Sequence, residues 1–171
     1  EFSPSDSDIV VVHISDLHFG EDFGYKLDVR GRAINESQAD ITTLLESDIR
    51  SQNLQGRIDA IVISGDVACS GTSPEYCRAL DVLTGLANAL NVKKEHIVVV
   101  PGNHDLQWNP GEFSRREGGR NVSREGFDNF VSSLCGKPPA SSDMLQLVSR
   151  DGKTGLRIVT IDSNEVEGPE S

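Results

Sequence analysis

Three short clusters in this sequence combine the residue types that bind metal ions. They are Asp16-Leu17-His18, Gly65-Asp66 and Gly102-Asn103-His104-Asp105. Carboxylate oxygens and imidazole nitrogens, with no thiolate among them, favour Mn, Fe or Zn over the softest metals. Two such ions about 3.5–4 Å apart can clamp a phosphate group and activate a water molecule. The clusters therefore predict a two-metal site for phosphate chemistry, provided that the fold brings them together.

Each cluster taken alone also has a simpler interpretation. An Asp-x-His triplet arises by chance, and an Asp after a Gly is commonly a turn residue or a helix cap. In an extended chain the side chains of Asp16 and His18 would point the same way, so that one cation could contact both. Asp66 could then bridge to a second cation. The combination in one chain is what favours the functional interpretation.

Each cluster follows a run of apolar residues that is typical of a buried strand. The runs cover residues 9–15, 58–63 and 97–100 and are rich in Val and Ile. Apolar residues recur at helical spacing within residues 39–49 and 80–90, and Ser73 followed by Pro74 predicts the cap and start of the second helix.

Alternation of strands and helices implies a parallel sheet, because parallel neighbours need a long connection. The carboxyl ends of parallel strands lie along one edge, where ligand crevices form. We therefore expect the three clusters to meet at that edge.

The sequence after residue 105 is less regular. A further helix is predicted from its apolar residues, which are Phe127, Phe130, Val131 and Leu134, and two strands are predicted at residues 144–148 and 156–161. The expected fold class is α/β, a layered sheet sandwich with helices outside, incomplete at the C-terminus. Residues 1–8 are expected to be a disordered lead-in, or to remain from processing or cloning, and residues 9–171 to form the N-terminal portion of one domain.

Composition limits the classes of partner and compartment. The 171 residues are 36% apolar and 25% charged with a net charge of -11, which suits one globular domain and argues against a polymeric nucleic acid as partner. Three irregularly spaced cysteines fit neither a disulfide framework nor a zinc ribbon, and predict free thiols in a reducing compartment. The apolar run at residues 9–12 is too short for a signal peptide or a membrane span. The predicted location is cytoplasmic, with no membrane partner.

The three clusters resemble the first signature blocks of the calcineurin-like metallophosphoesterase superfamily, over roughly residues 9–105. The last predicted strand, which ends in Asp162-Ser163, is similar to the fourth strand of that family. The resemblance implies a dinuclear hydrolase in which a metal-bound hydroxide attacks the phosphorus of a phosphate ester.

The resemblance also implies a role for each matching residue. Asp16 and His18 would bind the first metal, Asp66 would bridge both metals, and Asn103 would bind the second. Asn103 and His104 would contact the substrate phosphate, and His104 would give a proton to the leaving oxygen. His104 could instead be a packed residue, and the following Asp105 could orient a neighbour or cap a turn.

The sequence departs from the family pattern downstream. The family completes its site with further histidines, whereas this sequence has none after His104. The second metal would then have only Asp66 and Asn103 from this chain, which is thin coordination. Either the sequence is part of a larger chain, which we expect, or the second half of the site has been lost.

The expected substrate is a phosphodiester, with a nucleotide as one option. Residues 65–66 followed by residues 71–76 are similar to the cyclic-nucleotide and related phosphodiesterase branch of the family. Arg115 and Arg116 could bind the substrate phosphate, or could belong to a solvated loop. Two alternatives stay open: a nuclease of the same superfamily, and a non-catalytic scaffold or regulatory module that retains the fold.

Overall fold

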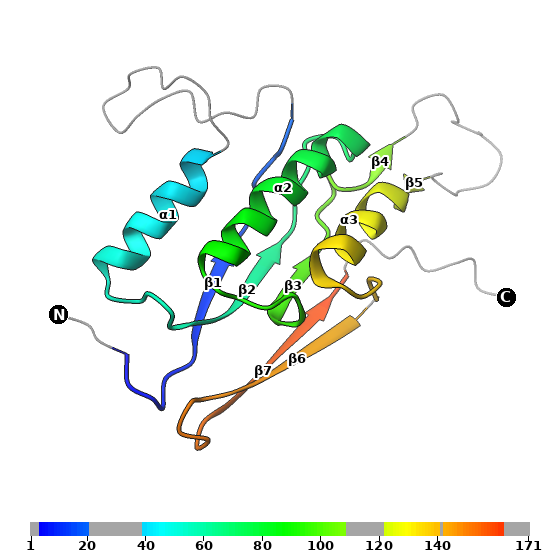
Figure 1. The fold of residues 1–171 in the computed structure, drawn as a ribbon. Coiled ribbons are helices and arrows are strands. Elements are labelled where there is room, and N and C mark those ends of the chain that lie inside the picture. The colour runs from blue at the N-terminus through cyan, green and yellow to red at the C-terminus, as the bar shows by residue number, and fades with distance from the viewer. Residues whose placement is uncertain (1–3, 21–38, 109–121, 141, 163–171) are drawn as a thin grey trace, which may run out of the picture.

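The structure is a computed structural model of the chain and describes residues 4–20, 39–108, 122–140 and 142–162. Its elements are β1 (Val10–Ile14), α1 (Ala39–Ser51), β2 (Ile58–Ser64), α2 (Ser73–Ala89), a 3-10 helix η1 (Lys94–His96), β3 (Ile97–Val100), β4 (Gln107–Trp108), β5 (Val122–Ser123), α3 (Glu125–Cys135), β6 (Ser142–Val148) and β7 (Gly155–Ile161). β1, β2 and β3 form a parallel sheet with β2 in the centre (Figure 1). The predicted α/β fold with a parallel sheet is confirmed.

One face of the parallel sheet packs against the three α-helices (Figure 1). In β2, Ile61 and Ile63 point to this face and Ala60 points to the other, as the alternation of a strand requires. The helices bury the apolar stripes that the sequence predicted, which include Leu83, Leu86 and Ala87 of α2, Leu90 at its C-cap, and Phe127, Phe130, Val131 and Leu134 of α3. This core fixes the position of the sheet edge from which the loops emerge.

The start of α2 differs slightly from the prediction. The cap is Thr72 rather than Ser73, and Pro74 lies in the first turn. The carboxylate of Glu75 accepts hydrogen bonds from the backbone N–H groups of Thr72, at 2.9 Å, and Ser70, at 3.1 Å. A Glu at the third helical position can satisfy the backbone N–H of the cap, which explains why the helix begins one residue earlier.

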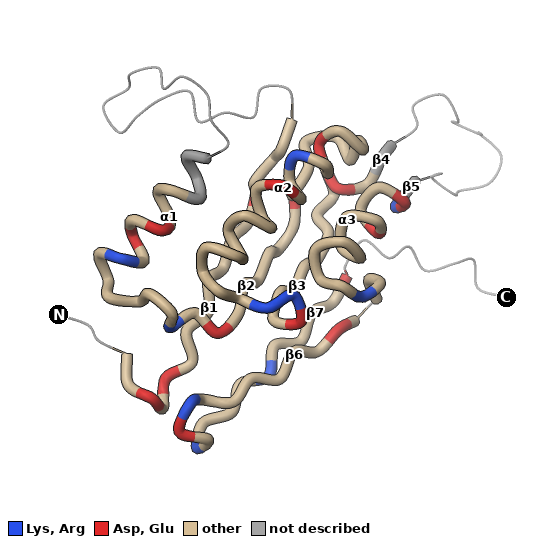
Figure 2. Tube along the Cα trace, in the orientation of Figure 1, with Lys and Arg blue, Asp and Glu red and all other residues tan. Residues whose placement is uncertain are grey.

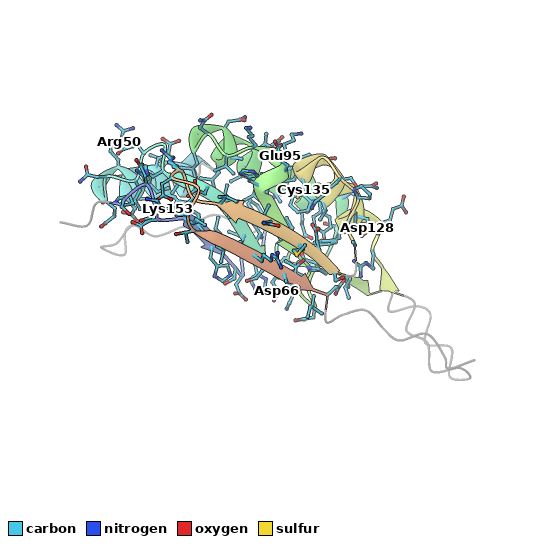
Figure 3. All side chains as sticks on the ribbon, turned by 90° about the horizontal axis from the view of Figure 1, so that it is seen from below. Arg50, Asp66, Glu95, Asp128, Cys135 and Lys153 are labelled. Atoms are coloured by element: carbon cyan, nitrogen blue, oxygen red, sulfur yellow. The ribbon has the colours of Figure 1, made fainter. Side chains whose placement is uncertain are left out.

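The other face of the sheet is covered by a hairpin. β6 and β7 pair in antiparallel register, with Met144 opposite Val159. The inner side of the hairpin, with Leu145 and Leu147, packs on Ala60 and Val98 of the sheet. Figure 3, seen from below, shows the hairpin crossing this face. The outer side exposes apolar residues, which are Met144, Val148, Val159 and Ile161.

Residues before β1 contact the body of the fold. Arg57 donates a hydrogen bond to the carbonyl of Ser5 and forms an ion pair with Asp6. The division of the chain at residue 8 stays a prediction. Within the described ranges, no helix is long and apolar enough to cross a membrane.

Candidate metal centre

The three clusters lie at the carboxyl ends of β1, β2 and β3, in loops that we call loop 1 (residues 15–20), loop 2 (residues 65–72) and loop 3 (residues 101–106). Loop 1 and loop 2 continue the pairing of their strands. The backbone N–H of His18 donates to the carbonyl of Asp66 at 2.9 Å, and that of Phe19 donates to the carbonyl of Val67 at 2.8 Å. The loops are therefore tied to each other beyond the sheet.

The backbone of loop 1 is not extended as the sequence interpretation assumed. Asp16 and His18 have φ values of 55° and 49°, in the left-handed region. The alternation argument for these two side chains is therefore wrong. Asp66 of loop 2 also has a left-handed φ, of 50°. Non-glycine residues in this region are held by their surroundings and occur often at functional sites.

Side chains from all three loops meet in one group. His18, Asp66 and His104 each offer a ligand atom, and these atoms lie within 4.8 Å of one another. Nε2 of His18 is 3.9 Å from Oδ2 of Asp66. The rings of His18 and His104 meet edge to face, with centroids 4.9 Å apart. We call these three residues the His-Asp-His cluster.

His104 is oriented by two hydrogen bonds. Its backbone N–H donates to Oδ1 of Asp66 at 3.0 Å, and its ring Nδ1 lies 2.8 Å from the carbonyl oxygen of Cys69. A carbonyl oxygen only accepts, so Nδ1 carries the proton. Nε2 of His104 is therefore the atom left for a cation or for proton transfer.

Gly102 allows the close approach of loop 3 to loop 2. A Cβ atom at this position would lie 2.0 Å from Oδ1 of Asp66 and 2.4 Å from its backbone nitrogen. No side chain fits at that distance, so a glycine is required here. The contact places the Asp66 carboxylate directly beside the backbone of loop 3.

Asp105 orients neighbouring backbone, one of the two roles that the sequence left open. The residue is 1% exposed. Its carboxylate accepts hydrogen bonds from the N–H groups of Val67 at 3.1 Å, Ala68 at 2.8 Å and Gly102 at 2.9 Å. Burial raises the pKa of the Asp105 carboxyl, and the three N–H groups oppose that rise.

Tyr76 of α2 is a further contact that the sequence interpretation missed. Its hydroxyl donates to the carbonyl oxygen of Asp105 at 2.7 Å, and its ring stacks on Phe130 with centroids 5.4 Å apart. Burial, with a smaller contribution from the charge of Asp105, raises the pKa of the Tyr76 phenol above its ordinary value. A lone aromatic residue on an apolar helix face gives no signal of such a contact.

The other predicted site residues are placed less closely together. Asp16 is exposed and does not belong to the His-Asp-His cluster, and Asn103 is exposed beside His104. Arg115 and Arg116 lie outside the described residues. His13 of β1 contacts the hydroxyl of Ser64, the last residue of β2, at 2.6 Å and does not belong to the His-Asp-His cluster.

The His-Asp-His cluster fits a divalent cation. It presents two imidazole nitrogens and one carboxylate oxygen, which suit Zn, Mn or Fe. Oδ1 of Asp66 accepts the backbone N–H of His104, and Oδ2 is the oxygen that faces His18. The donors converge from three loops. Backbone hydrogen bonds join loops 1 and 2, and the carboxylates of Asp66 and Asp105 join loops 2 and 3.

A family comparison agrees with this geometry. The sequence model of the calcineurin-like phosphoesterases matches residues 9–166, which is most of the chain. The chain belongs to the calcineurin-like phosphoesterase family. This family normally binds divalent metals, so the His-Asp-His cluster of this calcineurin-like phosphoesterase lies where a metal is expected.

Two curated proteins illustrate the relatives of this calcineurin-like phosphoesterase. The chain is 36% identical over 95 residues to the SbcD component of nuclease SbcCD from Escherichia coli, a match that covers 56% of this chain and 21% of the relative. It is 34% identical over 101 residues to glycerophosphodiester phosphodiesterase GpdQ of Enterobacter lignolyticus, covering 57% of this chain and 30% of the relative. The matched segment thus spans less than a third of either relative.

Proposed function

We propose that this protein is a metal-dependent phosphodiesterase with a dinuclear centre at the carboxyl edge of the parallel sheet. The observation that carries the proposal is the His-Asp-His cluster, because it joins residues from three separate loops. Convergence of three loops on one point is costly in backbone freedom and is typical of a functional site.

In this proposal two cations, Mn, Fe or Zn, are held by the chain. His18 and Asp66 would hold them, and Asp16 and Asn103 are the remaining predicted ligands, whereas His104, the third member of the cluster, would serve the proton transfer. When bound, the cations would supply Lewis-acid stabilisation of the phosphoryl oxygens and a water of lowered pKa.

His104 is the proposed proton donor to the leaving oxygen. In the imidazolium form, Nδ1–H donates to the carbonyl of Cys69 and the proton on Nε2 is the one that passes to the leaving oxygen, which leaves a neutral His104 with its proton on Nδ1. The hydrogen bond from the His104 backbone to Asp66 keeps the ring beside the carboxylate. His104 and Asn103 are the proposed contacts to the substrate phosphate, and Arg115 and Arg116 remain predicted contacts.

A phosphodiester is the favoured substrate class, with a nucleotide as one option. Both named relatives support it, since one is a component of a nuclease and the other a glycerophosphodiester phosphodiesterase. The free thiols of Cys69, Cys77 and Cys135 support a reducing compartment such as the cytoplasm.

The test is Mn-dependent hydrolysis of bis(p-nitrophenyl) phosphate and of p-nitrophenyl phosphate by the full-length protein. We expect faster turnover of the diester, and loss of turnover by about 100-fold or more in His104→Ala. His96→Ala is the matched control, because His96 precedes the amino end of β3, opposite to the three loops, and its ring contacts the carbonyl of Asp59. It should keep full activity. Absence of metal-dependent turnover of either ester would favour the scaffold or regulatory module.

A nuclease is the second candidate, because the match to the SbcD component of nuclease SbcCD covers more than half of the chain. The distribution of basic residues argues against a nuclease. Figure 2 shows Lys and Arg scattered singly or in short groups over the described residues, without a continuous basic stripe. A nuclease that grips a phosphate backbone would show DNA binding that weakens steeply with salt. Salt-independent hydrolysis of small diesters without DNA binding would exclude this candidate.

A further inference from the structure

Two carboxylates exchange hydrogen bonds between loop 2 and loop 3. Asp66 of loop 2 accepts the backbone N–H of His104 in loop 3. Asp105 of loop 3 accepts the backbone N–H groups of Val67 and Ala68 in loop 2. The first carboxylate faces the cluster and the second is buried beneath it. Neither loop can shift without breaking bonds made by the other.

The first turns of α2 reach all three loops. Arg78 donates to the carbonyl of Gly20 in loop 1 at 2.8 Å, and Glu75 accepts the N–H of Ser70 in loop 2. Tyr76 donates to the carbonyl of Asp105 in loop 3. The helix is thus a common support, and Tyr76 is its contact to the buried carboxylate residue.

We propose that Asp105 and Tyr76 are positioning residues of the metal centre. They set the separation of loop 2 and loop 3 that brings Asp66 within reach of both His18 and His104. This inference rests on the proposed function, since it requires a cation at the cluster. It goes further by assigning a role in metal binding to two buried residues that do not touch the cation.

Burial alone does not account for these two residues. A residue that only filled the core could be apolar, whereas Asp105 places a carboxylate among three N–H groups with 1% exposure. Backbone N–H groups at strand ends can donate hydrogen bonds to water. Here three of them donate to one buried carboxylate instead, which fixes the geometry of the loops. Groups that orient ligands in this way commonly change metal affinity when they are altered.

Tyr76→Phe is the sharpest variant. It removes one oxygen atom and leaves the ring stacked on Phe130, so the core packing is kept. Asp105→Asn keeps the shape but places an amide NH₂ against one of the N–H groups that the carboxylate accepts. We expect a larger effect from Asp105→Asn than from Tyr76→Phe.

The experiment is a Co²⁺ titration of the full-length protein, followed by visible absorption and by calorimetry. We expect Co²⁺ affinity to fall about 10-fold in Tyr76→Phe and about 100-fold in Asp105→Asn, with altered absorption bands. In assays of diester hydrolysis, kcat should fall more than KM. Val82→Ala, a buried substitution in α2 away from the loops, is the control for lost stability and should bind Co²⁺ normally.

Each outcome decides between the two proposals. Wild-type affinity and absorption in folded Tyr76→Phe and Asp105→Asn would overturn the positioning role and leave the proposed function intact. No Co²⁺ binding to the wild-type protein, or binding unaffected by His18→Ala, would overturn the proposed function and this inference together. If Asp105→Asn does not fold, Tyr76→Phe decides the matter alone.

Discussion

The backbone is left-handed both just past the helices and at the ends of β1 and β2, and the residues that adopt this conformation differ between these two regions. Just past the helix ends they are Asn53, Asn91 and Gly136, which are types that tolerate positive φ. At the ends of β1 and β2 they are Gly65 and three non-glycine residues, Asp16, His18 and Asp66. At helix ends the residue type follows the backbone. At the strand ends the residue types are those that the proposed site requires, and hydrogen bonds between the loops hold the backbone in the left-handed conformation.

The difference predicts how each region responds to substitution. At the helix ends a change should alter stability and leave activity unchanged. At the strand ends a change should alter activity more than stability, and removal of a side chain there can even favour folding. In the loops, we therefore expect substitutions that raise the free energy of unfolding to lower the activity.

Gly102→Ala should give the largest effect. The new Cβ would overlap Asp66, so the carboxylate must move, and a displacement of about 1 Å can lower turnover about 100-fold. The measurements are the rate of diester hydrolysis and the affinity of the variant for Co²⁺. Gly85→Ala is the control, because Gly85 lies in α2 with no atom within 4 Å of the added Cβ. It should raise the free energy of unfolding by about 1 kcal/mol with unchanged activity. Equal activity in both variants would contradict the close packing of loops 2 and 3.

Gly136→Ala should lower the free energy of unfolding by about 1–2 kcal/mol, because Gly136 ends α3 with φ 72°. The added methyl group meets only ordinary contacts with Lys94, at 3.9 Å, so the cost comes from the backbone alone. Urea denaturation measures the loss. The folded protein should keep its turnover, and a large loss of kcat would show that this helix end is coupled to the site.

Cys135, at the same helix end, should make the protein less stable in alkali. Burial raises the pKa of its thiol from 9.0 to about 11. The unfolded chain ionises first, so stability is complete below pH 9 and is lost as pH rises toward 11. At pH 10 the loss should be about 1 kcal/mol. We expect Cys135→Ala to show a smaller fall in unfolding free energy between pH 7 and pH 10. An identical fall would mean that other groups cause it.

Asp16→Gly should have the smallest effect on stability. It should raise the free energy of unfolding, whereas Gly136→Ala should lower it. Asp16 is exposed, so glycine relieves the left-handed backbone without loss of packing, and the free energy of unfolding should rise by about 0.5 kcal/mol. Metal-dependent turnover should fall if Asp16 is a ligand. Asn53→Gly is the matched variant at a helix end and should change neither quantity much. Loss of stability in Asp16→Gly alone would show that its side chain supports the loop.

The sequence was sufficient for the longer elements of the fold, but it did not predict η1, β4 and β5, which have only two or three residues each. Continuous β-branched runs predicted β1, β2 and β3, because strands buried on both faces need apolar residues at successive positions. Helical spacing likewise predicted α2 and α3. These signals are local, since each depends on neighbours within one element.

The sequence was not sufficient for the geometry of the loops. The left-handed φ of Asp16 and His18 accompanies pairing with loop 2, about 50 residues away in the chain. The contact between Tyr76 and Asp105 joins a helix to a loop 29 residues later. Such contacts depend on tertiary packing, so residue spacing could place His18, Asp66 and His104 at one edge but could not orient them.

The exchange of carboxylate hydrogen bonds between loops 2 and 3 has a consequence for hydrogen exchange. Strand ends usually fray, and their amide protons exchange early. Here the amide protons of Val67, Ala68, Gly102 and His104 are held by carboxylates from the facing loop or from their own loop. These protons should exchange slowly and together, as one cooperative unit. The edge of the sheet that carries the cluster would then be among its most protected parts.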